Sequence, residues 1–190
     1  MDVSTLDSLP DDAFIAAVGP WFEGAPRFLR RLAAARPFGD ESTLFARAAD
    51  IARAMPEDEQ LELIDAHPRL GAPPATVSAA SFREQGYDRE AAASIEDLDR
   101  LNAIYEGRHG FRFCVFVNGR SRPELVPILE AALTADRGAE IGRALDDVIA
   151  IARDRSTSEE RAVDIASRVV AFTEYPMEVR QIMNESSSAL

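Results

Sequence analysis

The sequence has few of the residues that build disulfides and metal sites, with one cysteine and two histidines among 190 residues. The lone Cys114 excludes an internal disulfide. A zinc site would need mostly carboxylate ligands, and no spacing typical of metal binding occurs, so we expect no metal. A glycine-rich phosphate loop and a G-x-S-x-G nucleophile elbow are missing as well, which argues against those two common kinds of site.

Positive charge and long apolar runs are also scarce. Lys and Arg number 21 against 33 Asp and Glu, which gives a net charge of −12. A surface of this sign repels a phosphate backbone, so nucleic acid is not an expected partner. No apolar run of about 18 residues and no basic-plus-apolar N-terminal segment occurs, so we predict a soluble, cytoplasmic protein without membrane contact.

What the sequence does have is helical periodicity. Hydrophobic residues make up 46% of the chain, enough for one sizeable core. They recur at helical spacing in successive segments, most of which stop at a proline or a glycine. Ser121 and Glu124 form a capping-box pattern at the start of one segment. Near the C-terminus we expect one helix around Ile141 to Ala152 and a separate one from about residue 158 to about residue 172.

One short stretch, FRFCVFVNG, departs from this helical pattern. Phe111, Phe113, Val115 and Val117 alternate with other residues before an Asn-Gly turn, as in a strand. No second strand is available to pair with it. We therefore predict an all-α, single-domain bundle of about eight helices with one short extended segment near 111–117.

The stretch LIDAHPRLG places a histidine directly before a proline. Pro68 disfavours the helical conformation of the residue before it, so a helix should end near Ala66 and leave His67 at its negative C-terminal end. A helix cap is the simpler interpretation of this histidine. However, Arg69, Gly71 and the following Pro-Pro pair make a stiff loop of the kind that carries binding groups on a helical scaffold.

The stretch SFREQG carries a second polar cluster. Ser81 and Glu84 have the spacing of a capping box, which needs no further function. Together with Gln85 they also place a hydroxyl, a carboxylate and an amide at a helix N-terminus, where a carboxylate-bearing small molecule could bind. The second histidine, His109, precedes Gly110 and is interpreted as a C-terminal cap.

Five segments in this order resemble the 2-oxo-4-hydroxy-4-carboxy-5-ureidoimidazoline (OHCU) decarboxylase family: FEGAPRFLRRLAAARPF, LELIDAHPRLG, SFREQG, LNAIYEGRHGFRFCVFVNGRS and LDDVIAIARDR. The resemblance extends from about Leu6 to Arg155. It implies an all-helical carboxy-lyase that needs no cofactor and converts OHCU to (S)-allantoin in urate degradation. Three departures from the family pattern occur. The loop at 71–81 is shorter, and His109 stands where a phenylalanine is common. The last helix of the resemblance ends Asp154-Arg155-Ser156, where the family usually has Leu-Arg-Leu.

The resemblance also implies roles for individual residues. His67 would be the catalytic proton donor, with Glu84 and Arg155 as the other catalytic residues; Arg153 is a second candidate for the site arginine. The substrate-binding residues implied by the family's motifs are Pro68, Ser81, Gln85, Phe113, Cys114, Val115, Phe116 and Val117. The last five would act through the backbone of the extended segment.

Two alternatives remain at this point: a decarboxylase of a related ureido-acid, and an inactive binding or interaction module on the same scaffold. The resemblance places the decarboxylase-like domain at 1–155. Residues 156–190 would form a helical extension, because Ile165, Val169 and their neighbours lie on one apolar stripe. This extension would pack on the same domain or on a partner subunit, so a homodimer is one expected arrangement.

Overall fold

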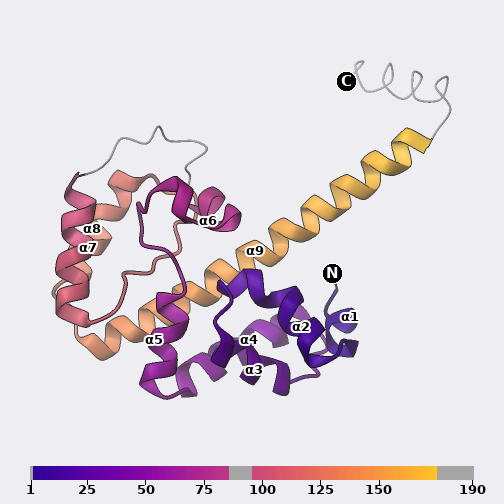
Figure 1. The fold of residues 1–190 in the computed structure, drawn as a ribbon, viewed down its shortest axis with the longest axis horizontal. Coiled ribbons are helices and arrows are strands. Elements are labelled where there is room, and N and C mark those ends of the chain that lie inside the picture. Colours follow the sequence, from indigo (N-terminus) through magenta and orange to yellow (C-terminus); the bar gives the residue numbers. More distant parts are fainter. Residues whose placement is uncertain (1, 86–95, 175–190) are drawn as a thin grey trace. The chain divides into compact units, whose positions relative to one another are not determined.

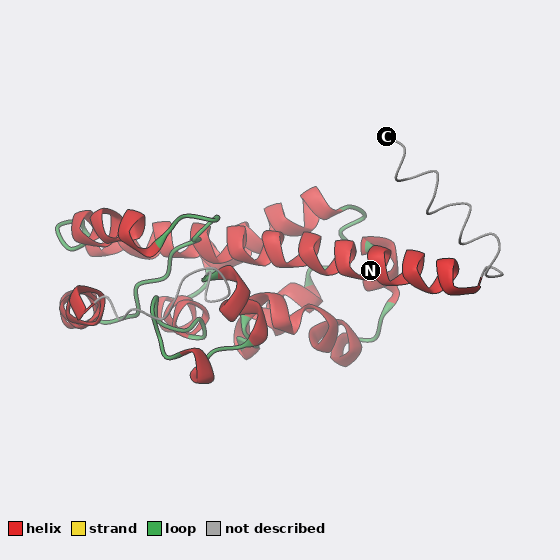
Figure 2. Cartoon of the chain, turned by 90° about the horizontal axis from the view of Figure 1, so that it is seen from above, coloured by secondary structure: helices red, strands yellow, loops and turns green. Residues whose placement is uncertain are grey.

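The computed structural model describes residues 2–85 and 96–174, and the side chains of Pro74, Glu84, Glu96, Asp97 and residues 159–174 fall outside that description. Every regular element in the described part is a helix, which confirms the predicted all-α class (Figure 2). The chain divides into two compact units, Met1–Arg153 and Asp154–Leu190. The first unit holds all of the predicted site residues except Arg155. The predicted domain limits, 1–155 and 156–190, stay a prediction.

The described residues form nine α-helices and two short 3-10 helices, labelled in Figure 1 where there is room. In chain order they are α1 (Val3–Ser8), α2 (Asp11–Val18), η1 (Gly19–Phe22), α3 (Pro26–Ala34), α4 (Glu41–Ala54), α5 (Glu57–Asp65), η2 (Pro74–Thr76), α6 (Ala79–Glu84), α7 (Glu96–His109), α8 (Arg122–Ala132) and α9 (Arg137–Glu174). The predicted capping box of Ser121 and Glu124 is confirmed at the start of α8.

The final helix differs from the prediction. Two separate helices were expected in the last part of the chain, whereas α9 runs without a break from Arg137 to Glu174. The reason is that the sequence from Arg143 to Glu174 contains neither glycine nor proline, so no residue there ends a helix. The polar stretch Ser156 to Ser158 is tolerated inside the helix, because serine and threonine disfavour a helix only weakly.

The core of the first unit is built around α3. This helix packs against α2, α4 and α5, while α7 packs against α8. Phe14, Phe22, Phe28 and Phe45 are among the largest fully buried side chains, and the rings of Phe22 and Phe28 lie 4.8 Å apart. Burying one such side chain contributes about 1.5–3 kcal/mol, so these contacts fix α3 as a base for its neighbours.

Ion pairs attach α5 to α3. Arg27 donates from Nε to Glu62 Oε2 at 2.5 Å and also pairs with Asp58. Arg31 reaches Glu59 with two hydrogen bonds, at 2.6 and 2.9 Å. The acidic residues at the start of α5 also suit the positive end of the helix dipole. The helix that leads to His67 is therefore held along its length.

None of the described helices is both long and apolar enough to cross a membrane.

Candidate active site

His67 lies directly after the end of α5. The helix ends at Asp65 with Ala66 as its C-cap, and the His67 amide donates to Ile64 O at 3.1 Å, which confirms the predicted helix end. The side chain is 3% exposed, and its Nδ1 lies 3.2 Å from Leu63 O. Because a carbonyl can only accept, this contact assigns a proton to Nδ1. Nε2, on the far side of the ring, is then the nitrogen at which a second proton is gained or lost.

The side chain of Gln85, which follows α6, and that of Asn102 in α7 hold the loop that follows His67. Gln85, directly after α6, accepts from Gly71 N at 2.9 Å and donates from Nε2 to Arg69 O at 3.2 Å. Asn102 of α7 donates from Nδ2 to Leu70 O at 3.0 Å, and it is fully buried. Gln85 and Asn102 therefore satisfy main-chain polar groups of Arg69, Leu70 and Gly71. In this structure the side chain of Gln85 stabilises the loop.

Gly71 is a position of this loop that strongly favours glycine. Its φ is +79°, a conformation that side chains with a Cβ rarely adopt. A Cβ added there would also lie 2.7 Å from Leu98 Cδ2. The loop therefore passes close to α7 because residue 71 has no side chain.

Arg112 joins the end of α5 to the start of the extended segment. Its amide donates to Asp65 Oδ1 at 2.8 Å, and its guanidinium donates to Asp65 O at 2.6 Å and to His67 O at 3.2 Å. The structure thus brings together two groups that the sequence had predicted separately, His67 and residues 111–117.

The extended segment uses part of its main chain within the protein. Cys114 O accepts from Arg143 Nη1 at 2.9 Å, Val117 O accepts from Arg120 N at 3.0 Å, and Phe116 O also accepts from Arg120. In the described part of the chain, no hydrogen bond reaches the main chain of Phe113 or Val115, although both residues are buried. Cys114, Phe116 and Val117 are therefore bonded to protein, whereas Phe113 and Val115 receive no such bond from the described residues.

A partly buried charged cluster supports the segment at Cys114. Arg143 of α9 donates to Asp147 Oδ2 at 2.7 Å and to Glu140 Oε2 at 3.0 Å, and its guanidinium lies 4.9 Å from the centre of the Phe113 ring. Tyr105 OH donates to Glu140 Oε2 at 2.9 Å. Burial raises the pKa of Asp147 above its ordinary value, and Arg143 opposes that rise. Each charge in the cluster has an opposite partner, which is what makes its burial tolerable.

The predicted capping box at Ser81 and Glu84 is wrong. Helix α6 begins at Ala79, and its N-cap is Ser78, whose side chain accepts from Ser81 N at 3.1 Å. Ser81 is therefore already in the first turn. Its hydroxyl, on a residue 1% exposed, donates instead to Glu23 Oε1 at 2.6 Å.

Glu23 is a residue that the sequence analysis did not single out. It directly follows η1 in a left-handed conformation, with φ of +50°, and it reaches α6 from 58 positions away. Its Oε1 also accepts from Ser78 Oγ at 2.9 Å. The only local signal was an acidic residue before Gly24 in an apolar stretch, which indicates a turn but does not name a partner.

The remaining predicted residues lie as follows. Pro68 directly follows His67 and is half-buried. Glu84 is the last residue of α6, and its side chain lies outside the described part of the structure. Arg155 belongs to the second unit, so its role in the site stays a prediction. Arg153 places its guanidinium 5.1 Å from the centre of the Phe45 ring, which is a packing contact.

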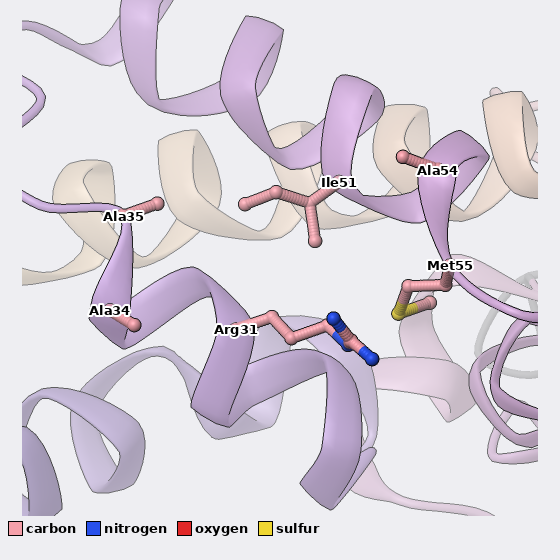
Figure 3. A pocket seen from close by; sticks show the side chains of 6 residues that line it. All are labelled: Arg31, Ala34, Ala35, Ile51, Ala54 and Met55. Atoms are coloured by element: carbon pink, nitrogen blue, oxygen red, sulfur yellow. The ribbon is translucent and has the colours of Figure 1, made fainter.

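A pocket of about 330 Å³ lies elsewhere, between α3 and α4. Figure 3 shows Arg31, Ala34 and Ala35 on one side and Ile51, Ala54 and Met55 on the other. It includes none of the predicted site residues, and Glu59 already binds the guanidinium of Arg31. Its apolar lining offers no acid or base for catalysis. Among the described residues, no group of three or more His, Cys, Asp and Glu could hold a metal ion.

The arrangement of helices matches known structures. A crystal structure of (S)-allantoin synthase superimposes with a TM-score of 0.63 at 23% identity, covering 83% of this chain and 53% of that one. A crystal structure of OHCU decarboxylase in the presence of (S)-allantoin gives 0.58 at 21% identity, covering 70% and 89%. These likenesses show that the chain shares the helical fold of these two proteins. Residues 7–157 also match the family model described as OHCU decarboxylase, and the chain belongs to this family.

Curated relatives agree with this assignment. The uric acid degradation bifunctional protein PucL of Bacillus subtilis is 33% identical over 153 residues, which are 79% of this chain and 31% of that protein. OHCU decarboxylases of Haloferax volcanii and Halalkalicoccus jeotgali are 27% and 30% identical, covering 82% and 80% of this chain and 94% and 88% of theirs. The chain thus spans about a third of PucL and most of the two archaeal proteins. The predicted family, a family of carboxy-lyases, is confirmed.

Proposed function

We propose that this protein decarboxylates OHCU to (S)-allantoin, as an enzyme of urate degradation that uses no cofactor. The observation that carries the proposal is the placement of His67 at the end of α5, next to the extended segment and tied to it through Arg112. Family membership supports the same reaction.

The chemistry of the substrate explains why side chains alone can perform this reaction. Loss of CO2 from the tertiary carbon leaves a carbanion that the neighbouring imidazolone delocalises, so the electron sink is in the substrate. The protein has to orient the carboxylate, exclude water and return one proton to one face of the ring. A buried acid next to a rigid loop suits these three tasks.

His67 is the proposed proton donor. With Nδ1 facing Leu63 O, Nε2 is the position from which the proton is delivered. The negative end of α5 favours the protonated form that this role requires. Glu84 together with His67 would hold the substrate hydroxyl and carboxylate out of the ring plane, and Arg155 would balance the charge.

The extended segment is proposed to bind the ureido-imidazolone edge of the substrate. The main chain of Phe113 and Val115 is supported for this role, because the described structure places no hydrogen bond on it while Cys114 and Phe116 are bonded to Arg143 and Arg120. Buried amide and carbonyl groups strongly favour a polar partner. Ser81, Gln85 and Pro68 complete the proposed binding set.

The test is to generate OHCU from urate in the cuvette, add the protein and follow optical rotation at a wavelength sensitive to allantoin. Uncatalysed decay gives a racemic product, so a growing signal reports enzymatic formation of one enantiomer. A silent assay with retained allantoin binding would instead support an inactive binding module. Turnover of another ureido-acid alone would support a decarboxylase of different substrate range.

A homodimer and the role of residues 156–190 are also proposals. An apolar stripe on the last part of the chain is the feature that favours contact with a partner subunit. Light scattering on the full chain and on a chain truncated after Arg155 tests this proposal. A dimeric full chain and a monomeric truncated chain would support it, and two monomeric chains would exclude it.

A further inference from the structure

The carboxylate of Glu23 collects two serine hydroxyls on one oxygen. Ser78 Oγ and Ser81 Oγ donate to Glu23 Oε1 at 2.9 and 2.6 Å. The two serines differ in surroundings: Ser78 is an exposed N-cap, whereas Ser81 is 1% exposed and belongs to the proposed binding set. Only one of the two hydrogen bonds therefore involves a residue proposed to touch substrate.

A serine hydroxyl has one proton and two lone pairs, and an ionised carboxylate can only accept. Once the Ser81 proton is given to Glu23, the oxygen of Ser81 has only lone pairs left for a third group. A hydrogen bond to a charged group is also the stronger kind, so this direction is firmly set.

We infer that Glu23 is a positioning residue that fixes the Ser81 proton, so that Ser81 accepts a hydrogen bond from an N–H group of the substrate. This inference rests on the proposed function. It makes the Ser81 end of the site selective for the N–H-bearing part of OHCU. A carboxylate or carbonyl oxygen placed there would meet a lone pair and, behind it, a negative charge, which is unfavourable. The substrate carboxylate must then lie away from Ser81.

The experiment compares Glu23→Met, Glu23→Gln, Ser81→Ala and the double variant Glu23→Met/Ser81→Ala with the unmodified protein. Steady-state decarboxylation of OHCU and the binding of (S)-allantoin are both measured. Glu23→Met should raise KM and weaken allantoin binding about tenfold, the scale of one hydrogen bond, with kcat changed less than about threefold. Glu23→Gln should recover part of the loss, because its amide oxygen can still accept from Ser81.

Ser81→Ala should lose as much as Glu23→Met, and the double variant should be no worse than Ser81→Ala, because the two residues act as one unit. Ser78→Ala is the matched control: it removes a hydrogen bond to the same Glu23 oxygen but not the proposed substrate contact. We expect its KM to stay within about twofold of the unmodified value, and thermal melts report whether each variant is folded.

Losses that add in the double variant, or an equal effect of Ser78→Ala, would overturn the inference, since Glu23 would then act by placing α6 as a whole. Unchanged KM and allantoin binding in Glu23→Met would overturn it as well. These outcomes are distinct from failure of the proposed function, which would show as no decarboxylation of OHCU by the unmodified protein.

Discussion

The two histidines of the chain offer a comparison between a proposed catalytic residue and a structural one. Both are buried, His67 at 3% and His109 at 2% exposure, and both stand at the C-terminal end of a helix. Each ring also has one nitrogen near a main-chain carbonyl. By burial and position alone, the two could not be told apart.

They differ in the nitrogen that is used and in what surrounds the ring. His109 uses Nε2, at the tip of its ring, to reach Ala132 O at 3.0 Å, which links α7 to α8. Its ring also lies 4.5 Å from that of Tyr105. His67 uses Nδ1, the nitrogen nearer its own backbone, for a carbonyl of its own helix, and its main-chain carbonyl accepts from Arg112. A histidine whose tip joins two helices supports the fold, whereas one held by Nδ1 can direct its tip at a substrate.

The largest effect should come from His67→Asn. The asparagine amide can keep a hydrogen bond near Leu63 O but cannot deliver a proton at neutral pH. We expect kcat to fall about a hundredfold or more, the scale of a positioned acid, with little change in melting temperature. Optical rotation and circular dichroism measure the two quantities. Near-normal turnover in a folded variant would return His67 to the role of a helix cap.

His109→Ala should give the reverse result. It removes the ring contact with Tyr105 and the hydrogen bond from His109 Nε2 to Ala132 O, which links α7 to α8. The free energy of unfolding should fall by about 2–4 kcal/mol, as measured by urea denaturation. The kcat of the folded fraction should stay within about threefold of the unmodified value. A large fall in kcat without a loss of stability would contradict the structural assignment.

Asn102→Ala tests whether the loop after His67 needs its brace. The substitution leaves the buried Leu70 O without its donor, which should lower the free energy of unfolding by about 1–3 kcal/mol. Because the loop carries the backbone next to His67, KM should rise as well, by about threefold. Ser121→Ala, which removes a cap remote from this loop, serves as a control for stability loss alone.

The smallest effect is expected from His109→Phe. A phenyl ring keeps the packing against Tyr105, and it removes His109 Nδ1, which has no hydrogen-bond partner among the described residues. Loss of the bond to Ala132 O offsets that gain. Together the two changes should leave the free energy of unfolding within about 1 kcal/mol of that of the unmodified protein. The kcat should not change. A loss of activity here would show that the Nε2 link matters for the site.

Local rules predicted the parts of this molecule that depend on near neighbours. The end of α5 just before His67 follows from the proline after that histidine, and the break in the helical pattern at 112–117 follows from the alternating residues before Asn118 and Gly119. Helix α9 was divided wrongly because weak helix formers around Ser156 were taken as a break although no glycine or proline is present.

Contacts between distant residues could not be predicted in this way. The hydrogen bond of Ser81 to Glu23 spans 58 positions, and that of Arg112 to His67 spans 45. Neither hydrogen bond produces a recognisable pattern of residue types in the sequence. The capping box was assigned to Ser81 instead of Ser78 because two serines lie three residues apart, and the choice between them depends on where the backbone turns into the helix.

Gly71 has a consequence for how this sequence can vary. A positive φ and a 2.7 Å approach to Leu98 act on the same atom, the missing Cβ. A smaller residue at position 98 would relieve the contact but not the backbone strain at residue 71. A second substitution at position 98 would therefore compensate only partly for a side chain at position 71. In a library of random variants selected for activity, position 71 should therefore be strongly enriched in glycine.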